Sequence, residues 1–213
     1  MRLIRNATNR YKGAKNNMPE DENINTGAIS CDAGADLYRR WLGGDGTAFD
    51  KIIEIYHDAL IFFVYGTVKN FADAEDIAAD VFADLIVHPK RYSFGCSLKT
   101  YLFSVARNKA VDRIRHRRRF SDEDINESAE SIYDGKLLED KLIADEKAKA
   151  VRDALKEINP EYASVLRLTY FYGFSGDEVC FIMNKNKKQM ANLLYRGKES
   201  LRKALEGKGV ESV

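Results

Sequence analysis

Residues 47–64 read TAFDKIIEIYHDALIFFV, and this stretch decides the fold. Apolar residues recur in it at intervals of three and four, the spacing of one face of an α-helix. The residues on this face are Phe49, Ile52, Ile53, Tyr56, Leu60, Phe63 and Val64. Ile55 and Phe62 add a second apolar stripe, so the segment predicts a helix at the centre of a helical bundle.

Further helical patterns flank this central helix on both sides. A short pattern over 35–42 indicates a helix that Gly43 ends, and Thr47 is the expected N-terminal cap of the central helix. Asp73 is the expected cap of a third helix, which precedes Pro89. A fourth helix should run from Leu98 to about residue 118.

The second half of the chain repeats the helical pattern after a strongly acidic segment. Residues 121–146 hold ten acidic residues against two basic ones, a bias typical of a linker. Helical patterns follow over about 148–158 and 162–170, then from Ser175 to Met183 and from Lys187 to Leu205. We predict an all-α protein with a disordered extension (1–34), a helical domain (35–119), an acidic flexible linker (120–146), a second helical domain (147–206) and a tail (207–213).

Composition excludes several classes of protein. Of 213 residues 45% are apolar and 31% charged, and no apolar run approaches the roughly 20 residues that span a bilayer. The first residues lack the apolar core of a secretory signal, so we expect a cytoplasmic protein without membrane insertion. The three cysteines form no CxxC pair, the three histidines lack metal-ligand spacing, and no phosphate-binding loop occurs. We therefore expect no enzyme, catalytic residue, metal, cofactor or small-molecule substrate.

Basic residues gather at the end of the fourth helix. Between positions 107 and 119 seven Lys or Arg residues face a single acid, Asp112, and such a density favours binding to phosphates. Cations also interact favourably with a helix C-terminus, which would account for two or three of them. Tyr92, Phe94 and Tyr101 lie just before the cluster among basic residues, where they could either stack on unpaired bases or belong to the core.

An acidic stripe follows the third helix. Asp73, Asp76, Asp80 and Asp84 step by three and four residues, so they share one face although like charges at this spacing repel. A basic protein surface opposite this face is one interpretation, and an ordinary solvated face is the other. In the second domain, two helices joined by the short polar turn 184–186 have the layout of a helix-turn-helix, although a hairpin within any bundle would look similar.

Three motifs in this order resemble the extracytoplasmic-function (ECF, group IV) sigma factors of bacterial RNA polymerase, in the sigma-70 superfamily. Residues 74–85, AEDIAADVFADL, and 101–113, YLFSVARNKAVDR, are similar to the family patterns AEDxxQDxFxxL and WLxxIARNxxxDxxR of region 2. Residues 173–198 align without a gap to the region 4 pattern GLSYEEIAEILGIPxGTVKSRLHRAR. The chain departs from these patterns at Ala79, at Tyr101 and at Ala191-Asn192-Leu193.

The resemblance implies that the chain binds core RNA polymerase and directs transcription initiation at promoters with minus-10 and minus-35 elements. The polymerase-binding residues that it implies are Asp73, Asp76, Asp80, Phe82 and Asp84. The implied minus-10 contacts are Arg91, Tyr92, Phe94, Lys99, Tyr101, Arg107, Asn108, Arg113 and Arg115. The implied minus-35 contacts are Lys187, Lys188, Gln189, Asn192, Arg196 and Lys198.

Two other classes of function compete with this interpretation. A helix-turn-helix regulator that binds duplex DNA without polymerase would need neither the acidic stripe nor the aromatic loop. An adaptor that binds only protein would need no arginine cluster. For a sigma factor, core RNA polymerase and promoter DNA are the expected partners, and an anti-sigma factor is a candidate third.

Overall fold

The computed structural model describes residues 32–120 and 146–207, and within them it forms helices and turns without a strand. The first unit holds α2 (Ala33–Leu42), α3 (Gly46–Val68), α4 (Phe71–Val87), the 3-10 turn Pro89–Arg91 and α5 (Leu98–Phe120). The second unit holds α6 (Glu146–Glu157), α7 (Pro160–Leu166), the π-helical turn Arg167–Phe171, α8 (Gly176–Met183) and α9 (Lys187–Glu206). The all-α prediction is confirmed; the predicted extension and most of the acidic linker lie outside the described residues.

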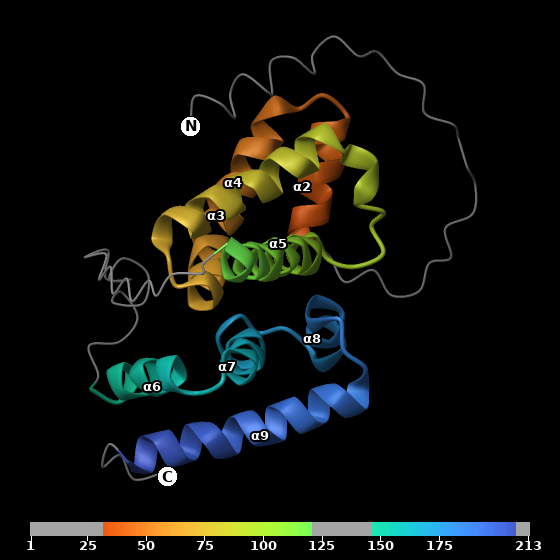
Figure 1. The fold of residues 1–213 in the computed structure, drawn as a ribbon. Coiled ribbons are helices and arrows are strands. Elements are labelled where there is room, and N and C mark those ends of the chain that lie inside the picture. Colours follow the sequence, from red (N-terminus) through yellow and green to blue (C-terminus); the bar gives the residue numbers. More distant parts are fainter. Residues whose placement is uncertain (1–31, 121–145, 208–213) are drawn as a thin grey trace.

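Helix α3 lies at the centre of the first unit and packs against α2, α4 and α5 (Figure 1). Its first apolar stripe is largely buried, with Phe49, Ile52, Leu60 and Val64 essentially without solvent contact. The second stripe is only partly covered, because Ile55 remains 52% exposed. The first stripe of α3 therefore faces the bundle core, and the second lies nearer its surface.

Two helix caps differ from the sequence-based expectation. Asp45, rather than Thr47, caps α3 by accepting a hydrogen bond from the Thr47 amide at 3.1 Å. Asn70, rather than Asp73, caps α4 and accepts from the Asp73 amide at 2.9 Å. Since Asp and Asn cap as well as the predicted residues do, sequence preference alone cannot choose between candidates two or three positions apart.

Helix α5 presents two different faces to its surroundings. Leu98, Leu102, Phe103, Ala106 and Ala110 have no solvent exposure and recur with helical spacing, so they fix one face of α5 in the bundle core. Lys99 and Thr100, in the first turn of α5, bind the second unit, which lies below α5 in Figure 1. The orientation of every polar side chain on α5 is thus set by this buried stripe.

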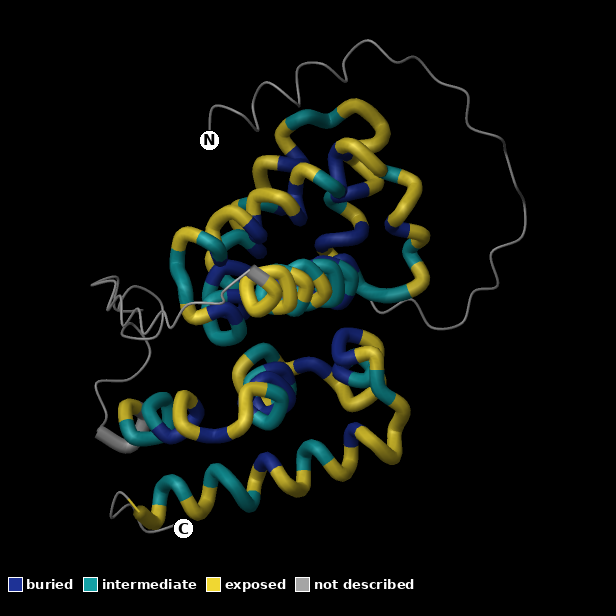
Figure 2. The backbone as a smooth tube through the Cα atoms, in the orientation of Figure 1, coloured by how far each residue is buried: buried dark blue, intermediate teal, exposed yellow. Residues whose placement is uncertain are grey.

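The second unit is built around two capped helices. Ser175 caps α8 in a reciprocal capping box with Glu178, as the sequence predicts for Ser175, and Asn186 caps α9 in the same way with Gln189. Between them Asn184 takes the left-handed conformation, with φ 50°, that turns the chain. Exposed and covered positions alternate along α9 (Figure 2).

The two units pack directly against each other. Helix α8 contacts α5, and α7 contacts α3. The hydrophobic cluster of the first unit continues into the second through Val165, Leu168, Phe174 and Val179. The described residues of both units therefore share this hydrophobic cluster, and a second cluster, formed by Leu155, Ile158, Ala163 and Leu166, lies within the second unit.

Phe82 tests the packing of the first unit. Its side chain is 0% exposed and lies edge-on to Phe49, with ring centroids 6.5 Å apart. We expect Phe82→Ala to lower the free energy of unfolding by about 3–5 kcal/mol, because it leaves a cavity in a packed core. Urea unfolding followed by circular dichroism measures this loss, and a change below about 1 kcal/mol would contradict the core assignment.

Candidate nucleic-acid interface

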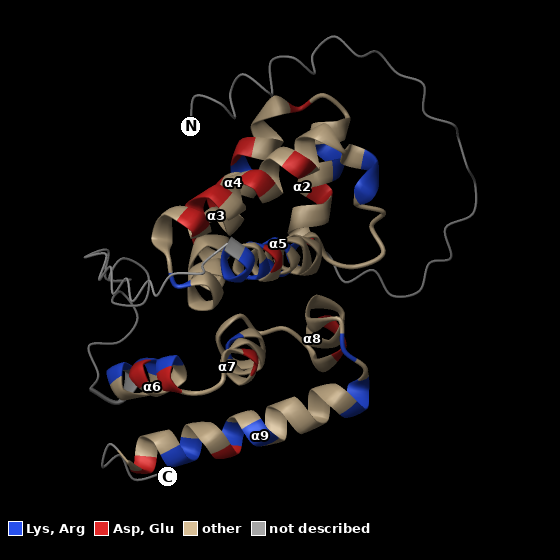
Figure 3. Cartoon of the chain, viewed as in Figure 1, with Lys and Arg blue, Asp and Glu red and all other residues tan. Residues whose placement is uncertain are grey.

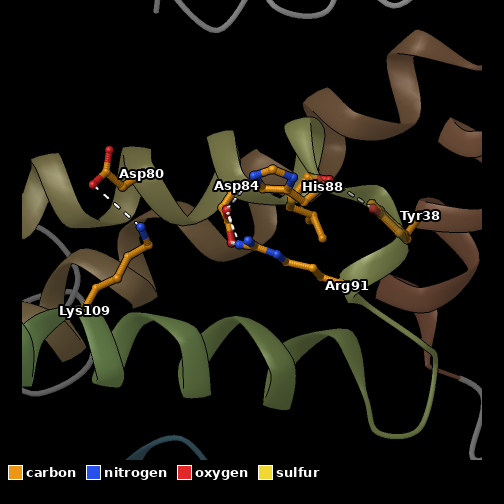
Figure 4. A network of polar contacts seen from close by, with 7 residues as sticks. Tyr38, Asp80, Asp84, His88, Arg91 and Lys109 are labelled. Atoms are coloured by element: carbon orange, nitrogen blue, oxygen red, sulfur yellow. Dashed lines mark hydrogen bonds and ion pairs between the residues drawn. The ribbon is translucent and has the colours of Figure 1, made fainter. Parts of the chain in front are cut away.

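Acidic residues follow α4 (Figure 3), and basic residues of the same chain neutralise both ends of this stripe. Asp73 accepts a hydrogen bond from Arg113 at 2.5 Å and another from Arg117. Asp84 accepts from Arg91 at 2.7 Å, and His88 lies 3.7 Å from the same carboxylate (Figure 4). These contacts relieve the repulsion between like charges that the sequence pattern implies.

The middle of the stripe remains available to a partner. The Asp80 side chain is 61% exposed and lies 3.8 Å from the Nζ atom of Lys109 (Figure 4). Asp76 is also exposed. The expectation for Phe82 is corrected, because its side chain is buried in the bundle and cannot reach a partner surface while the bundle is folded.

The loop between α4 and α5 is organised by an aromatic cluster. The ring of Tyr92 is buried and lies 4.7–5.5 Å from the rings of Phe94, Tyr101 and Tyr38. Its hydroxyl donates to the Cys96 carbonyl oxygen at 2.8 Å, and burial raises the pKa of this phenol, which keeps it a neutral donor. Tyr92 is therefore part of the core, and its assignment as a base-stacking residue is corrected.

Phe94 and Tyr101 are only half-buried. Phe94 adopts φ 60°, an uncommon backbone conformation for a bulky residue. The Arg39 guanidinium lies 4.7 Å from its ring centroid, and the Tyr38 ring lies 6.0 Å away. The loop thus holds the Phe94 ring at the edge of the aromatic cluster, where one side is accessible.

The arginine cluster of α5 divides into two groups. Arg113 and Arg117 bind Asp73, and Arg115 lies 3.3 Å from Asp112. Arg118 and Arg119 are exposed at the end of the helix. The cluster therefore combines ion pairs that hold α4 against α5 with cations that can meet a polyanion.

The first half of α5 directs its polar residues toward the second unit. Lys99 donates from Nζ to the Tyr172 carbonyl oxygen at 2.6 Å. Burial lowers the pKa of Lys99 and also that of Arg107, whose charge is partly compensated by Glu161. Asn108, the residue after Arg107, lines a shallow groove between the units together with Ser104, Cys180, Phe181, Asn184, Lys185 and Asn186.

Helix α9 carries the predicted minus-35 residues. Some of their side chains are exposed without a contact described here, and others already contact a neighbouring residue. Lys188, Asn192 and Arg196 are exposed and follow each other at intervals of four, so they form one open row. Lys187 instead pairs with Asp177 at 2.8 Å, which raises the pKa of Lys187. Gln189 accepts from the Asn186 amide at 3.0 Å as part of the cap. The Lys198 Nζ atom lies 5.5 Å from the Tyr170 ring centroid.

One further residue of this row is not among those predicted from the sequence. Tyr195 is 69% exposed, and it lies three positions after Asn192 and directly before Arg196. The signal that could have found it is its position on the helix, because the buried contacts of α9 fall at Met190 and Gly197. A large aromatic ring on an exposed, basic face is a candidate contact residue.

Other kinds of site find no support in the described ranges 32–120 and 146–207. They contain no group of three or more His, Cys, Asp or Glu side chains placed to hold a metal ion. None of their helices is long and apolar enough to cross a membrane.

Comparisons with known proteins match both units. The family model "Sigma-70 region 2" matches residues 52–120, and "Sigma-70, region 4" matches residues 148–201. "ECF RNA polymerase sigma factor SigW" of Bacillus subtilis (strain 168) is 28% identical over 170 residues, covering 76% of this chain and 91% of that protein. "ECF RNA polymerase sigma factor SigM" of the same organism is 26% identical, covering 76% and 96%.

A solved structure supports the same fold. It is the "Structure of CnrH in complex with the cytosolic domain of CnrY", with TM-score 0.59 and 18% identity, covering 83% of this chain and 99% of that one.

Proposed function

The chain belongs to the extracytoplasmic-function type of the sigma-70 family, whose members are transcription initiation factors, and on this premise we propose how it binds polymerase and promoter DNA. The observation that carries the proposal is the presence of both matched regions on one chain, each with exposed charged residues of the required sign. A regulator that acts without polymerase is not favoured, because it would need no region 2.

Core RNA polymerase binds the exposed middle of the acidic stripe, formed by Asp76 and Asp80. The ends of the stripe have a different role: Asp73 and Asp84 are paired with arginines of the same unit and position α4. A basic surface on the polymerase would meet these two exposed carboxylates and gain both steering and specificity.

Reversing the charge of Asp80 tests this surface. We expect Asp80→Arg to weaken binding to core polymerase at least tenfold, because the variant replaces attraction by repulsion at a basic partner. Competition binding against the wild-type chain measures the change. Asp50→Arg is the matched control, since Asp50 is an exposed acid on α3, outside the stripe. Equal affinity of both variants would remove the stripe from the polymerase interface.

The aromatic loop and α5 bind the melted minus-10 strand. Phe94 is the residue that meets an unstacked base, because Tyr92 is committed to the core. Tyr101, Lys99, Arg107 and Asn108 line the path that the strand would follow along α5. Taking a base out of the stack costs a few kcal/mol, which stacking on an aromatic ring offsets.

Truncation of Phe94 and truncation of Tyr92 should therefore have different effects, the first on strand opening and the second on stability. Phe94→Ala should lose about 1–3 kcal/mol of base stacking and impair strand opening, with little change in thermal stability. Tyr92→Ala should instead destabilise the first unit, because it removes a buried ring and hydroxyl. Permanganate reactivity of unpaired thymines and a melting curve separate the two; normal opening with Phe94→Ala would move the role to Tyr101.

Helix α9 enters the major groove of the minus-35 element. Lys188, Asn192 and Arg196 form its open row, and Tyr195 extends this row. Lys198, held near Tyr170, lies two residues after Arg196. In a helix-turn-helix the second helix reads base edges while cations bind phosphates.

Salt dependence distinguishes phosphate contacts on this helix. Lys188→Ala and Arg196→Ala should each weaken duplex binding and reduce the slope of log K against log salt by about one unit for each phosphate that the variant no longer binds. Affinity for a single-stranded minus-10 fragment should stay unchanged. Arg202→Ala serves as control, because Arg202 is paired with Glu199 and Glu206 farther along α9.

Run-off transcription tests the function as a whole. Core polymerase should produce specific transcripts from a library of promoter fragments only when the chain is added. An absence of transcripts, with core polymerase still bound, would overturn promoter recognition. The relatives in two solved structures are bound to partner proteins, "the cytosolic domain of CnrY" and "the anti-sigma factor NepR", and an anti-sigma partner for this chain forms part of the proposal.

A further inference from the structure

The Arg39 side chain, on α2, lies over Phe94, the ring to which the proposed function assigns an unstacked base. The guanidinium carbon of Arg39 is 4.7 Å from the Phe94 ring centroid. The Arg39 side chain is 48% exposed, and Phe94 is half-buried. The contact therefore lies at the surface, where a DNA strand can reach both groups. Helix α2 precedes the match to region 2, which begins at residue 52.

The residue before Arg39 fixes α2 beside the aromatic loop. Tyr38 is 0% exposed, and its hydroxyl donates to the Leu85 carbonyl oxygen at 3.0 Å, near the end of α4 (Figure 4). The Tyr38 ring lies 5.5 Å from that of Tyr92 and 6.0 Å from that of Phe94. Because the core holds Tyr38, the backbone of Arg39 keeps its place near Phe94 while the Arg39 side chain stays at the surface.

An acid on the same helix compensates the charge of Arg39. Nη1 of Arg39 donates to Oδ1 of Asp36 at 2.6 Å, and the Asp36 side chain is 59% exposed. A phosphate that approached this guanidinium would also meet the Asp36 carboxylate, which repels it. Since the N–H donors lie in the plane of the guanidinium, the bond to Asp36 occupies an edge and leaves the faces for stacking.

The distance between ring and guanidinium fits a closed form of a base-binding slot. Stacked bases are about 3.4 Å apart, so a base between the two groups needs a separation of about 7 Å, roughly 2 Å more than is present. Rotation about the bonds of the long, exposed Arg39 side chain supplies this movement without a shift of α2. The Phe94 ring has less room to move, because the Tyr92 ring lies 4.7 Å away.

We propose that Arg39 and Phe94 form a slot for one unstacked base of the melted strand, with the Arg39 guanidinium as the second stacking surface. Guanidinium planes, like aromatic rings, stack on unpaired bases. The inference deepens the proposed function and rests on it, because it adds a contact from α2 to the base that Phe94 meets. Stacking accepts every base, so Arg39 contributes affinity for an unpaired strand without sequence preference.

The experiment compares a strand that has bases with one that has none. The holoenzyme is formed from core polymerase and the full-length chain, and core polymerase alone gives the background. The probes are a random-sequence pool of single-stranded dodecamers and a dodecamer in which every nucleotide is abasic. Arg39→Ala should weaken binding to the pool at least fivefold, the lower end of what stacking on one base contributes. Its affinity for the abasic strand and the salt dependence of binding should not change.

Two further substitutions at the same position separate the plane of Arg39 from its charge. Arg39→Lys retains the charge but lacks the plane, so it should lose as much affinity for the pool as Arg39→Ala. Arg39→Trp lacks the charge but restores a plane, so it should bind the pool within about twofold of the wild-type chain. Wild-type affinity of Arg39→Lys, or failure of Arg39→Trp to restore binding, would overturn the proposal.

Arg40→Ala is the matched control. Arg40 is the next residue of α2, its side chain is 56% exposed, and it pairs with an acid, Asp45, at 2.6 Å, as Arg39 pairs with Asp36. The control should change binding to neither probe. A loss equal to that of Arg39→Ala would assign the effect to the charge of α2 as a whole and would overturn the slot.

A double variant tests whether Arg39 and Phe94 hold the same base. Once Phe94→Ala has removed one side of the slot, Arg39→Ala should weaken binding to the pool by less than about twofold more, because both losses concern one base. Full additivity would place Arg39 on a different nucleotide and overturn the proposal.

The remaining outcomes separate this inference from the proposed function. Loss of affinity for both probes on Arg39→Ala would overturn the slot: with a weaker salt dependence it indicates a phosphate contact, and with a lower melting temperature it indicates support of the loop. If Phe94→Ala weakens binding to the pool and Arg39→Ala does not, only the role of Arg39 fails. If neither variant weakens it, the base site of the proposed function fails as well.

Discussion

The structure depends on the burial of one face of α5. Five apolar residues of this helix have no solvent contact, and they fix its rotation relative to α3 and α4. Because successive residues of a helix are separated by a constant angle, fixing this face also fixes where Lys99, Thr100 and Asn108 point. The bundle core and the candidate nucleic-acid surface are therefore opposite sides of the same element, and a change in packing would displace the polar residues.

Charge in the first unit serves both stability and recognition. The acids at the two ends of the α4 stripe are paired with arginines from α5 and from the loop, and those in the middle are left exposed. Pairs at the ends hold the helices in place, although each exposed pair contributes little by itself. A partner therefore meets a short group of exposed carboxylates in the middle of α4, flanked by acids whose charge is already paired.

The sequence was sufficient for the fold class, for the order of the helices and for the helix-turn-helix, because apolar periodicity and Ser175 as a cap are local signals. It could not distinguish Asp45 from Thr47 or Asn70 from Asp73 as caps, since these residues have similar preferences. It also could not show that Phe82 and Tyr92 are buried, or that Glu178 meets Thr100, because such contacts join residues distant in the chain.

The backbone at Phe94 has a consequence for the free energy of the loop before α5. A left-handed conformation of a bulky residue costs on the order of 1–2 kcal/mol, and here the contacts of its ring with Arg39 and the neighbouring tyrosines maintain it. Any event that withdraws the ring from these contacts lets the backbone relax. The loop thus holds stored conformational free energy at Phe94, and under the proposed function a base that takes the place of these ring contacts would release it.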